Sequence, residues 1–176
     1  SEALFTRALS VAEKSSGPEH PIVAQIAHDQ ARALMSRGRI AAALLLLQRA
    51  LAIRTLVFGA EHFDTALTEL ELAKALRASG KPVESRTHAA TAVNALAILR
   101  AYPESHADAL GLLAELDRAK GDRALAEREL RAAIEIVEGL RPESGGGERA
   151  RAELVARHAS LYAGLAGLLA SNGDVA

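Results

Sequence analysis

The sequence predicts an all-α fold in which antiparallel helix hairpins stack in a row. Three observations lead to this prediction: a repeat of about 42 residues, a helical spacing of apolar residues inside each repeat, and a glycine at the same point of successive repeats. Composition agrees, because 49% of the residues are hydrophobic while only 3% are aromatic. A core of Ala, Leu, Ile and Val favours helices over a sheet.

The repeat is clearest between its first two copies. The segment FTRALSVAEKSSGPEHPIVA from Phe5 aligns with LQRALAIRTLVFGAEHFDTA from Leu47 at a constant offset of 42. A looser third copy follows, and a fourth carries about ten extra residues. We therefore expect a single repeat domain that is a fragment of a longer protein, with about three to four repeats. Its expected divisions are a partial second helix at 1–20, repeats at 21–62, 63–104 and 105–141, and a partial repeat at 142–176 with an inserted loop at 141–153.

Each repeat divides into two helices. Apolar residues at helical spacing predict the first helix over 21–37, with Pro21 in its first turn. Gly38 follows it, where a left-handed backbone is needed, and the second helix is expected from about Arg39 to Phe58. The same stop recurs at Gly80, Gly121 and Gly173. One hairpin cannot cover its own apolar face, so neighbouring hairpins should stack.

Alanines recur at two places that should lie between helices. They are Ala31, Ala73, Ala114 and Ala166, seven residues before the glycines, and Ala8, Ala50, Ala92 and Ala133 on the second helices. Alanine lets two helix axes approach closely, whereas a larger side chain holds them apart. Asp117 stands at a normally apolar place, so its hairpin is expected to be the least secure.

These motifs resemble the tetratricopeptide family in its 42-residue kinesin-light-chain-like form. The match is carried by GPEHP from Gly17, LQRALAIR from Leu47, GAEHF from Gly59 and LAELDRAKGD from Leu113. The resemblance implies a right-handed superhelix of helix pairs whose concave groove is lined by the first helix of each pair and recognises other proteins. The tail from Arg151 is similar to the last repeat that often precedes a CHAT protease domain in bacterial proteins.

The resemblance, with helical spacing, indicates which residues line the groove. They are Gln25, His28, Asp29 and Arg32 in the first complete repeat, Leu67, Leu70, Glu71, Lys74 and Arg77 in the second, and Leu112, Glu115 and Arg118 in the third. The cations would bind carboxylates and the leucines would bind apolar side chains, so we expect an extended or helical peptide with acidic and apolar residues. A merely solvated charged face is an equal alternative.

Composition disfavours several other classes. The net charge is -1 with no basic run, so we expect no nucleic-acid partner. There is no cysteine, which excludes thiolate chemistry. The longest apolar run, Ile40 to Leu47, is too short to span a membrane, so we expect a cytoplasmic protein. No cofactor is expected, and the oligomeric state stays open, with dimers through exposed repeat ends as one alternative.

Histidines raise a metal hypothesis that spacing disfavours. His20, His62 and His106 belong to different repeats and should cap helices or shape loops. His88 should form a surface pair with Glu84, and no third ligand is in view. We therefore predict no metal site and no catalytic residue. The expected function is a protein-interaction scaffold, and the alternative is the regulatory region of a larger effector enzyme such as a CHAT protease, kinase or NTPase.

Overall fold

The computed structural model describes residues 2–140, 153 and 155–173, and in this part of the chain there are eight long helices and no strand. The helices are α1 (Glu2–Ser16), α2 (Pro21–Met35), α3 (Ile40–Phe58), α4 (Phe63–Ala78), α5 (Pro82–Leu99), α6 (Pro103–Lys120), α7 (Arg123–Gly139) and α9 (Ala159–Gly173). The all-α prediction is confirmed.

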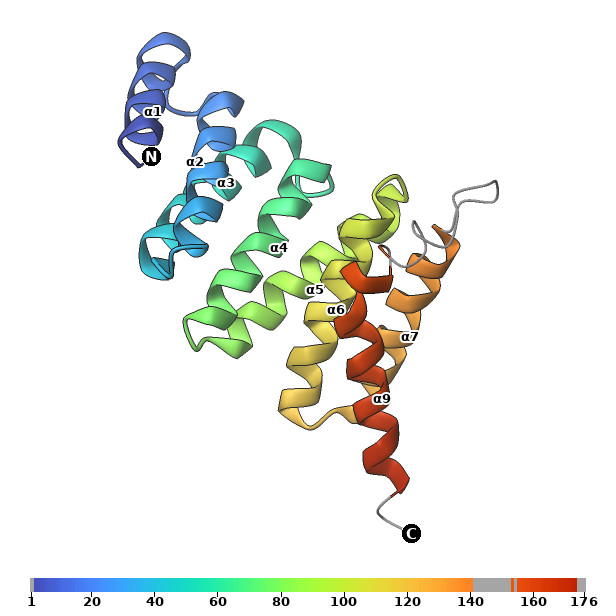
Figure 1. Ribbon diagram of the computed structural model, residues 1–176. Coiled ribbons are helices and arrows are strands. Elements are labelled where there is room, and N and C mark those ends of the chain that lie inside the picture. The colour runs from blue at the N-terminus through green and yellow to red at the C-terminus, as the bar shows by residue number, and fades with distance from the viewer. Residues whose placement is uncertain (1, 141–152, 154, 174–176) are drawn as a thin grey trace. The chain divides into compact units, whose positions relative to one another are not determined.

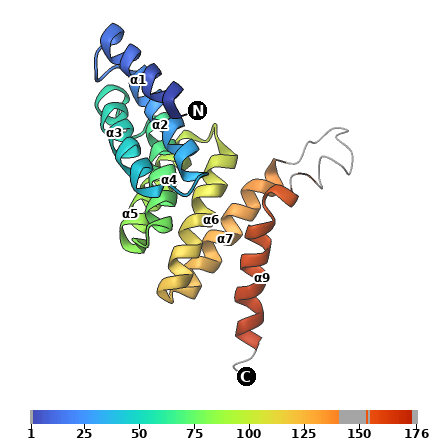
Figure 2. The same cartoon turned by 60° about the vertical axis from the view of Figure 1, so that its left-hand side comes forward.

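The chain forms two compact units, 1–99 with α1 to α5 and 100–176 with α6, α7 and α9. In the first unit each helix packs on the one before it, and α2 and α4 also contact each other (Figures 1 and 2). In the second unit α7 packs on both α6 and α9. The hairpins α2–α3, α4–α5 and α6–α7 are those that the repeat predicts, whereas the division into numbered repeats stays a prediction.

The turn inside each hairpin has the same hydrogen bonds. The N–H of Arg39 donates to the carbonyl of Leu34 at 2.9 Å, and Lys81 donates to Leu76 at 3.0 Å in the next hairpin. The glycine before each donor has a positive φ, 73° at Gly38 and 77° at Gly80. A residue with a side chain would be strained in this left-handed backbone conformation. The predicted stops at Gly38, Gly80 and Gly121 are therefore confirmed, whereas Gly173 is the last residue of α9 rather than the residue after it.

Most of the predicted alanines lie between helices. Ala31, Ala50, Ala73, Ala92 and Ala133 have no exposed surface, Ala114 is 1% exposed, and Ala8 is half-buried. Ala166 is the exception, because it is exposed on α9. There the small residue facing α7 is Gly164, where an added Cβ would lie 3.4 Å from the side chain of Leu130. The fourth repeat therefore departs from the register of the others.

Two further features differ from a simple apolar stack. Asp117 is fully buried in α6, yet it is not an isolated charge.

Helix α3 is, among the described residues, long and apolar enough by composition to cross a membrane, which is weak information on its own. Its buried residues Ala43, Leu47 and Ala50 belong to the cores shared with α1, α2 and α4, and Arg54 is buried on the same side. A mostly buried core helix satisfies the same composition test, and in α3 28% of the apolar window is buried.

Candidate functional site

The predicted groove residues of the first unit lie on α2 and α4. We call this surface the α2–α4 face; its exposed or half-buried members are Gln25, Asp29, Arg32, Leu67, Glu71, Lys74 and Arg77. Helices α2 and α4 contact each other, and the charges of Asp29, Arg32 and Glu71 all act on the pKa of His28. The two helices therefore contribute to one surface.

Three predicted groove residues are buried rather than open. His28 is 2% exposed, Leu70 is 1% exposed and Leu112 is 6% exposed. They occupy related places in successive repeats, 42 residues apart. Their side chains pack beneath the surface, where a partner cannot contact them.

A buried arginine connects α2, α3 and α4 beneath this face. The Nη1 group of Arg54 donates to Oγ1 of Thr68 at 2.7 Å and to the carbonyl of Asp64 at 3.0 Å, and it lies 3.3 Å from Nδ1 of His28. Arg54 is 2% exposed and Thr68 is fully buried. Buried polar networks of this kind specify one arrangement of the groups that they join, because each unsatisfied member is costly.

The network reaches the surface through Gln25. Its Oε1 accepts a 2.6 Å hydrogen bond from Nη2 of Arg54, and its Nε2 donates to Oδ2 of Asp29 at 2.9 Å. One turn further along each helix stand the cations Arg32 and Lys74, and Lys74 donates to Glu71 at 2.8 Å. Both helices thus carry a carboxylate followed three residues later by a cation, at matching places of the repeat.

The electrostatics of the cluster require a neutral histidine. Burial, followed by the charge of Arg54, lowers the pKa of His28 from 6.5 to about 4. Burial also lowers the pKa of Arg54, although Asp64 and Asp29 partly oppose it. Among the described residues, the carboxylate that forms an ion pair with Arg54 is that of Asp64, 4.0 Å from Nη2, and the hydrogen bonds of this cation go to neutral acceptors. A neutral His28 with Nδ1 as acceptor is therefore the form that fits beside Arg54.

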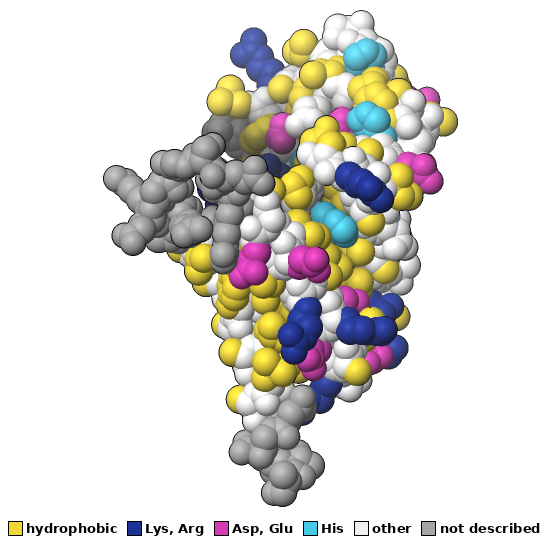
Figure 3. Space-filling model, turned by 90° about the vertical axis from the view of Figure 1, so that its right-hand side faces the viewer, with side chains coloured by type: hydrophobic (Ala, Val, Ile, Leu, Met, Phe, Trp, Pro, Cys, Tyr) yellow, Lys and Arg dark blue, Asp and Glu magenta, His cyan; other side chains and the backbone are white. Residues whose placement is uncertain are grey.

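The remaining predicted groove residues belong to the second unit. Glu115 and Arg118 are exposed on α6, and Leu112 is buried on the same helix. On the face drawn in Figure 3, Lys and Arg side chains lie among Asp and Glu side chains rather than in a separate patch. This part of the described surface offers scattered charges of both signs.

Two of the three histidines that were predicted to cap helices or shape loops are helix caps. Nδ1 of His20 accepts from the N–H of Ile22, and Nδ1 of His62 accepts from the N–H of Asp64, each at 3.2 Å. Both therefore cap helices, as predicted. His106 differs, because it lies inside the first turns of α6, where Tyr102 is the capping position. No group of three or more potential metal ligands gathers within the described ranges.

His88 forms its ion pair with Glu69 rather than with the predicted Glu84, although the charge of Glu84 also acts on the ring. Nδ1 of His88 lies 2.5 Å from Oε2 of Glu69, which is on the neighbouring helix α4. Glu84 instead lies 3.3 Å from Nζ of Lys81. Helical spacing identifies partners on one helix only, and this pair crosses between helices.

Arg54 was missed by sequence reasoning, although the repeat contains a signal for it. Ala12 and Leu96 stand 42 residues before and after Arg54, and both are buried apolar residues. A charge at a place that is otherwise apolar indicates a buried polar network. Its acceptors, Thr68 and the Asp64 carbonyl, carry no comparable signal.

Comparisons with known proteins agree with this architecture. Residues 1–56 match the family model described as Tetratricopeptide repeat. No curated protein sequence matches the chain significantly. A crystal structure of nearly identical TPR-like repeats assigned to a kinesin light chain of Podosopora anserina, in a variant form, has 24% identity and a TM-score of 0.76, covering 99% of this chain and 78% of that one.

Two further structures are similar. BtubC (BKLC) from P. vanneervenii has 20% identity and a TM-score of 0.79 over 98% of this chain and 65% of that one. The Sgt2 TPR domain from Aspergillus fumigatus has 18% identity and a TM-score of 0.59 over 86% of this chain and 80% of that one. Residues 1–56 match the tetratricopeptide repeat model, and the described residues have the fold of kinesin-light-chain-like tetratricopeptide repeats.

Proposed function

We propose that this chain is a protein-interaction scaffold whose α2–α4 face binds a segment of another protein. The observation that carries the proposal is the Arg54 network, which fixes Gln25 and, through it, Asp29 on that face. Side chains that are held in place before binding lose less conformational freedom when a partner arrives.

The chemistry of the face favours a partner segment with acidic and apolar residues. Arg32 is exposed at the centre of the face, and Lys74 and Arg77 follow on α4. Leu67 provides half-buried apolar surface beside them. Arginine forms paired hydrogen bonds with carboxylates, while apolar anchors supply most of the binding free energy. Asp29 and Glu71 would accept backbone N–H groups of the same segment.

A peptide-display selection tests this proposal without knowledge of the natural partner. A random library of about 12-residue peptides, long enough to cross neighbouring helices about 10 Å apart, is selected on the wild-type chain. We expect enriched peptides that combine Asp or Glu with Leu, Ile or Phe. The selection is repeated on the R32E/K74E/R77E variant and on a control of equal charge change, K14E/K81E/R128E. Loss of the enriched sequences on the first variant alone supports the proposal, and retention on both would refute it.

A further inference from the structure

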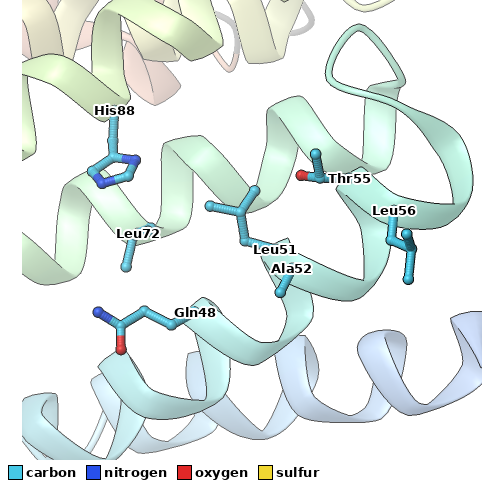
Figure 4. A pocket seen from close by; sticks show the side chains of 7 residues that line it. All are labelled: Gln48, Leu51, Ala52, Thr55, Leu56, Leu72 and His88. Carbon is cyan, nitrogen blue, oxygen red and sulfur yellow. The ribbon is translucent and has the colours of Figure 1, made fainter. Parts of the chain in front are cut away.

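A second candidate site lies between the second helices of two hairpins. Helices α3 and α5 both pack on α4, and a pocket of about 510 Å³ opens between them above Leu72 (Figure 4). Gln25, His28 and Arg54 are not among its lining residues, so it is separate from the α2–α4 face. Its volume lies within the range of about 300–1,000 Å³ that is usual for small-ligand sites.

The middle of the pocket is apolar, with Thr55 at one end and His88 and Gln48 at the other (Figure 4). Leu51 and Leu56 of α3 form one wall, and the buried Leu72 of α4 forms the floor. Leu56 is 68% exposed, so its side chain is open to contact from solvent. This combination provides space and contact surface for an aliphatic side chain.

His88 of α5 lies at the end of the pocket opposite Thr55 (Figure 4). Nδ1 of this ring lies 2.5 Å from Oε2 of Glu69, and the 14% exposed Glu69 side chain fixes the ring orientation. The outer edge of the ring points down toward Leu72 and Gln48 (Figure 4). The hydrogen bond with Glu69 raises the pKa of His88, against the effect of burial. When Nδ1 and Nε2 are both protonated, the second N–H is directed into the pocket.

The charged groups around the ring come from two helices. Glu69 on α4 and Glu84 on α5 both favour the protonated ring, and Glu84 is itself close to Lys81. The polar side chains that helix α3 contributes to the lining, Gln48 and Thr55, are both neutral. Glu69 binds Nδ1, and none of the lining residues is a carboxylate that could accept the outward N–H.

We propose that this pocket binds a partner's aliphatic side chain together with an adjacent carboxylate, which accepts a hydrogen bond from Nε2 of His88. The aliphatic group lies against Leu51, Leu56 and Leu72, and the carboxylate lies at the histidine end. A peptide ending in leucine, or one with an acidic residue beside an aliphatic one, has this chemistry. A carboxylate is favoured over an amide because a charged donor and a charged acceptor form the stronger hydrogen bond.

The test uses N-acetyl-leucine as the probe and N-acetyl-leucinamide as its uncharged match. Each is titrated into the 176-residue chain at pH 6, with methyl NMR signals of the leucines as the readout. We expect saturable shifts at Leu51, Leu56 and Leu72, with about fivefold tighter binding of the acid than of the amide. The H88Q variant should lose this preference but still bind both probes through the apolar walls.

Two controls keep the outcome decisive. The R32E/K74E/R77E variant should bind N-acetyl-leucine as the wild type does, so failure of the α2–α4 face as a binding site leaves this inference intact. The E69Q variant should weaken the preference for the acid, because it removes the charge that supports the imidazolium. Equal binding of acid and amide to the wild type, or no saturable shift at these leucines, would overturn the proposal.

Discussion

The guanidinium of Arg54 on α3 lies 3.3 Å from Nδ1 of His28 on α2, and each of these side chains is 2% exposed. A cation and a titratable ring are thus buried side by side between two hairpins. Thr68 and the Asp64 carbonyl of α4 complete the cluster. The contact between neighbouring hairpins therefore depends on a polar network as well as on apolar packing.

Replacing Arg54 with methionine should lower the free energy of unfolding by about 2–3 kcal/mol. The change introduces an apolar side chain of similar length and removes the donor to Oγ1 of Thr68 and Nδ1 of His28, and a buried group that loses its partner costs about 1–3 kcal/mol. Urea denaturation checks the value. The control is R49M, because Arg49 is 37% exposed in its ion pair with Glu13 and should contribute at most about 1 kcal/mol. Equal losses in the two variants would contradict the network.

Acidification should destabilise the protein through His28. The pKa of this group is about 4 in the folded chain and 6.5 as its ordinary value, so between these values the unfolded chain binds the extra proton. Stability is therefore fully present above pH 6.5 and is lost as the pH falls toward 4. The loss from pH 7 to pH 5 should be about 2 kcal/mol.

The H28Q variant is the matched control for this pH dependence. It retains a side-chain acceptor for Arg54 but cannot titrate, so its unfolding free energy should fall about 2 kcal/mol less than that of the wild type over the same range. His20, His62 and His88 are present in both proteins, and their contributions cancel in the comparison. Parallel pH curves for the two proteins would show that His28 is not buried as a neutral ring.

Removing the helix cap at His62 should cost about 0.5–2 kcal/mol. Nδ1 of His62 accepts the N–H of Asp64 at the start of α4, and alanine leaves this donor without a protein partner. H62D restores an acceptor and should recover most of the loss. Thermal unfolding of wild type, H62A and H62D gives the comparison, and equal stability of the two variants would argue against capping.

Overpacking between the two helices of a hairpin should also be destabilising. Ala73 has no exposed surface, and A73L should cost about 1–3 kcal/mol because the neighbouring helices cannot move apart freely. Ala41 is exposed on α3, and A41L should change stability by less than about 0.5 kcal/mol. Similar values for the two variants in urea denaturation would count against the alanine register.

The sequence predicted the hairpins well because their signals are local. Gly38 and Gly80 adopt the positive φ that the helix ends require, and the buried alanines follow from the repeat. The register failed in α9, where Ala166 is exposed and Gly164 faces Leu130 instead. The extra residues before α9 break the constant offset, so alignment to the other repeats no longer identifies its packed face.

The candidate site was predicted less completely, because its key contacts join different helices. Helical spacing placed Gln25, Asp29 and Arg32 on one stripe, but it could not show that Arg54 reaches Gln25 from α3. It also paired His88 with Glu84, whereas the ring meets Glu69 across the hairpin. Which residues of two helices meet depends on how the helices pack. The spacing of residues along the sequence does not give this information.

Calorimetric binding of one selected peptide to the wild type and to R32E/K74E/R77E tests the scaffold function most directly. With an acidic and apolar peptide, reversing three charges should raise the Kd at least about tenfold, or about 1.4 kcal/mol, while K14E/K81E/R128E should leave it within about twofold. The free energies of unfolding of the three proteins should agree within about 0.5 kcal/mol. An unchanged Kd for R32E/K74E/R77E would contradict binding at the α2–α4 face.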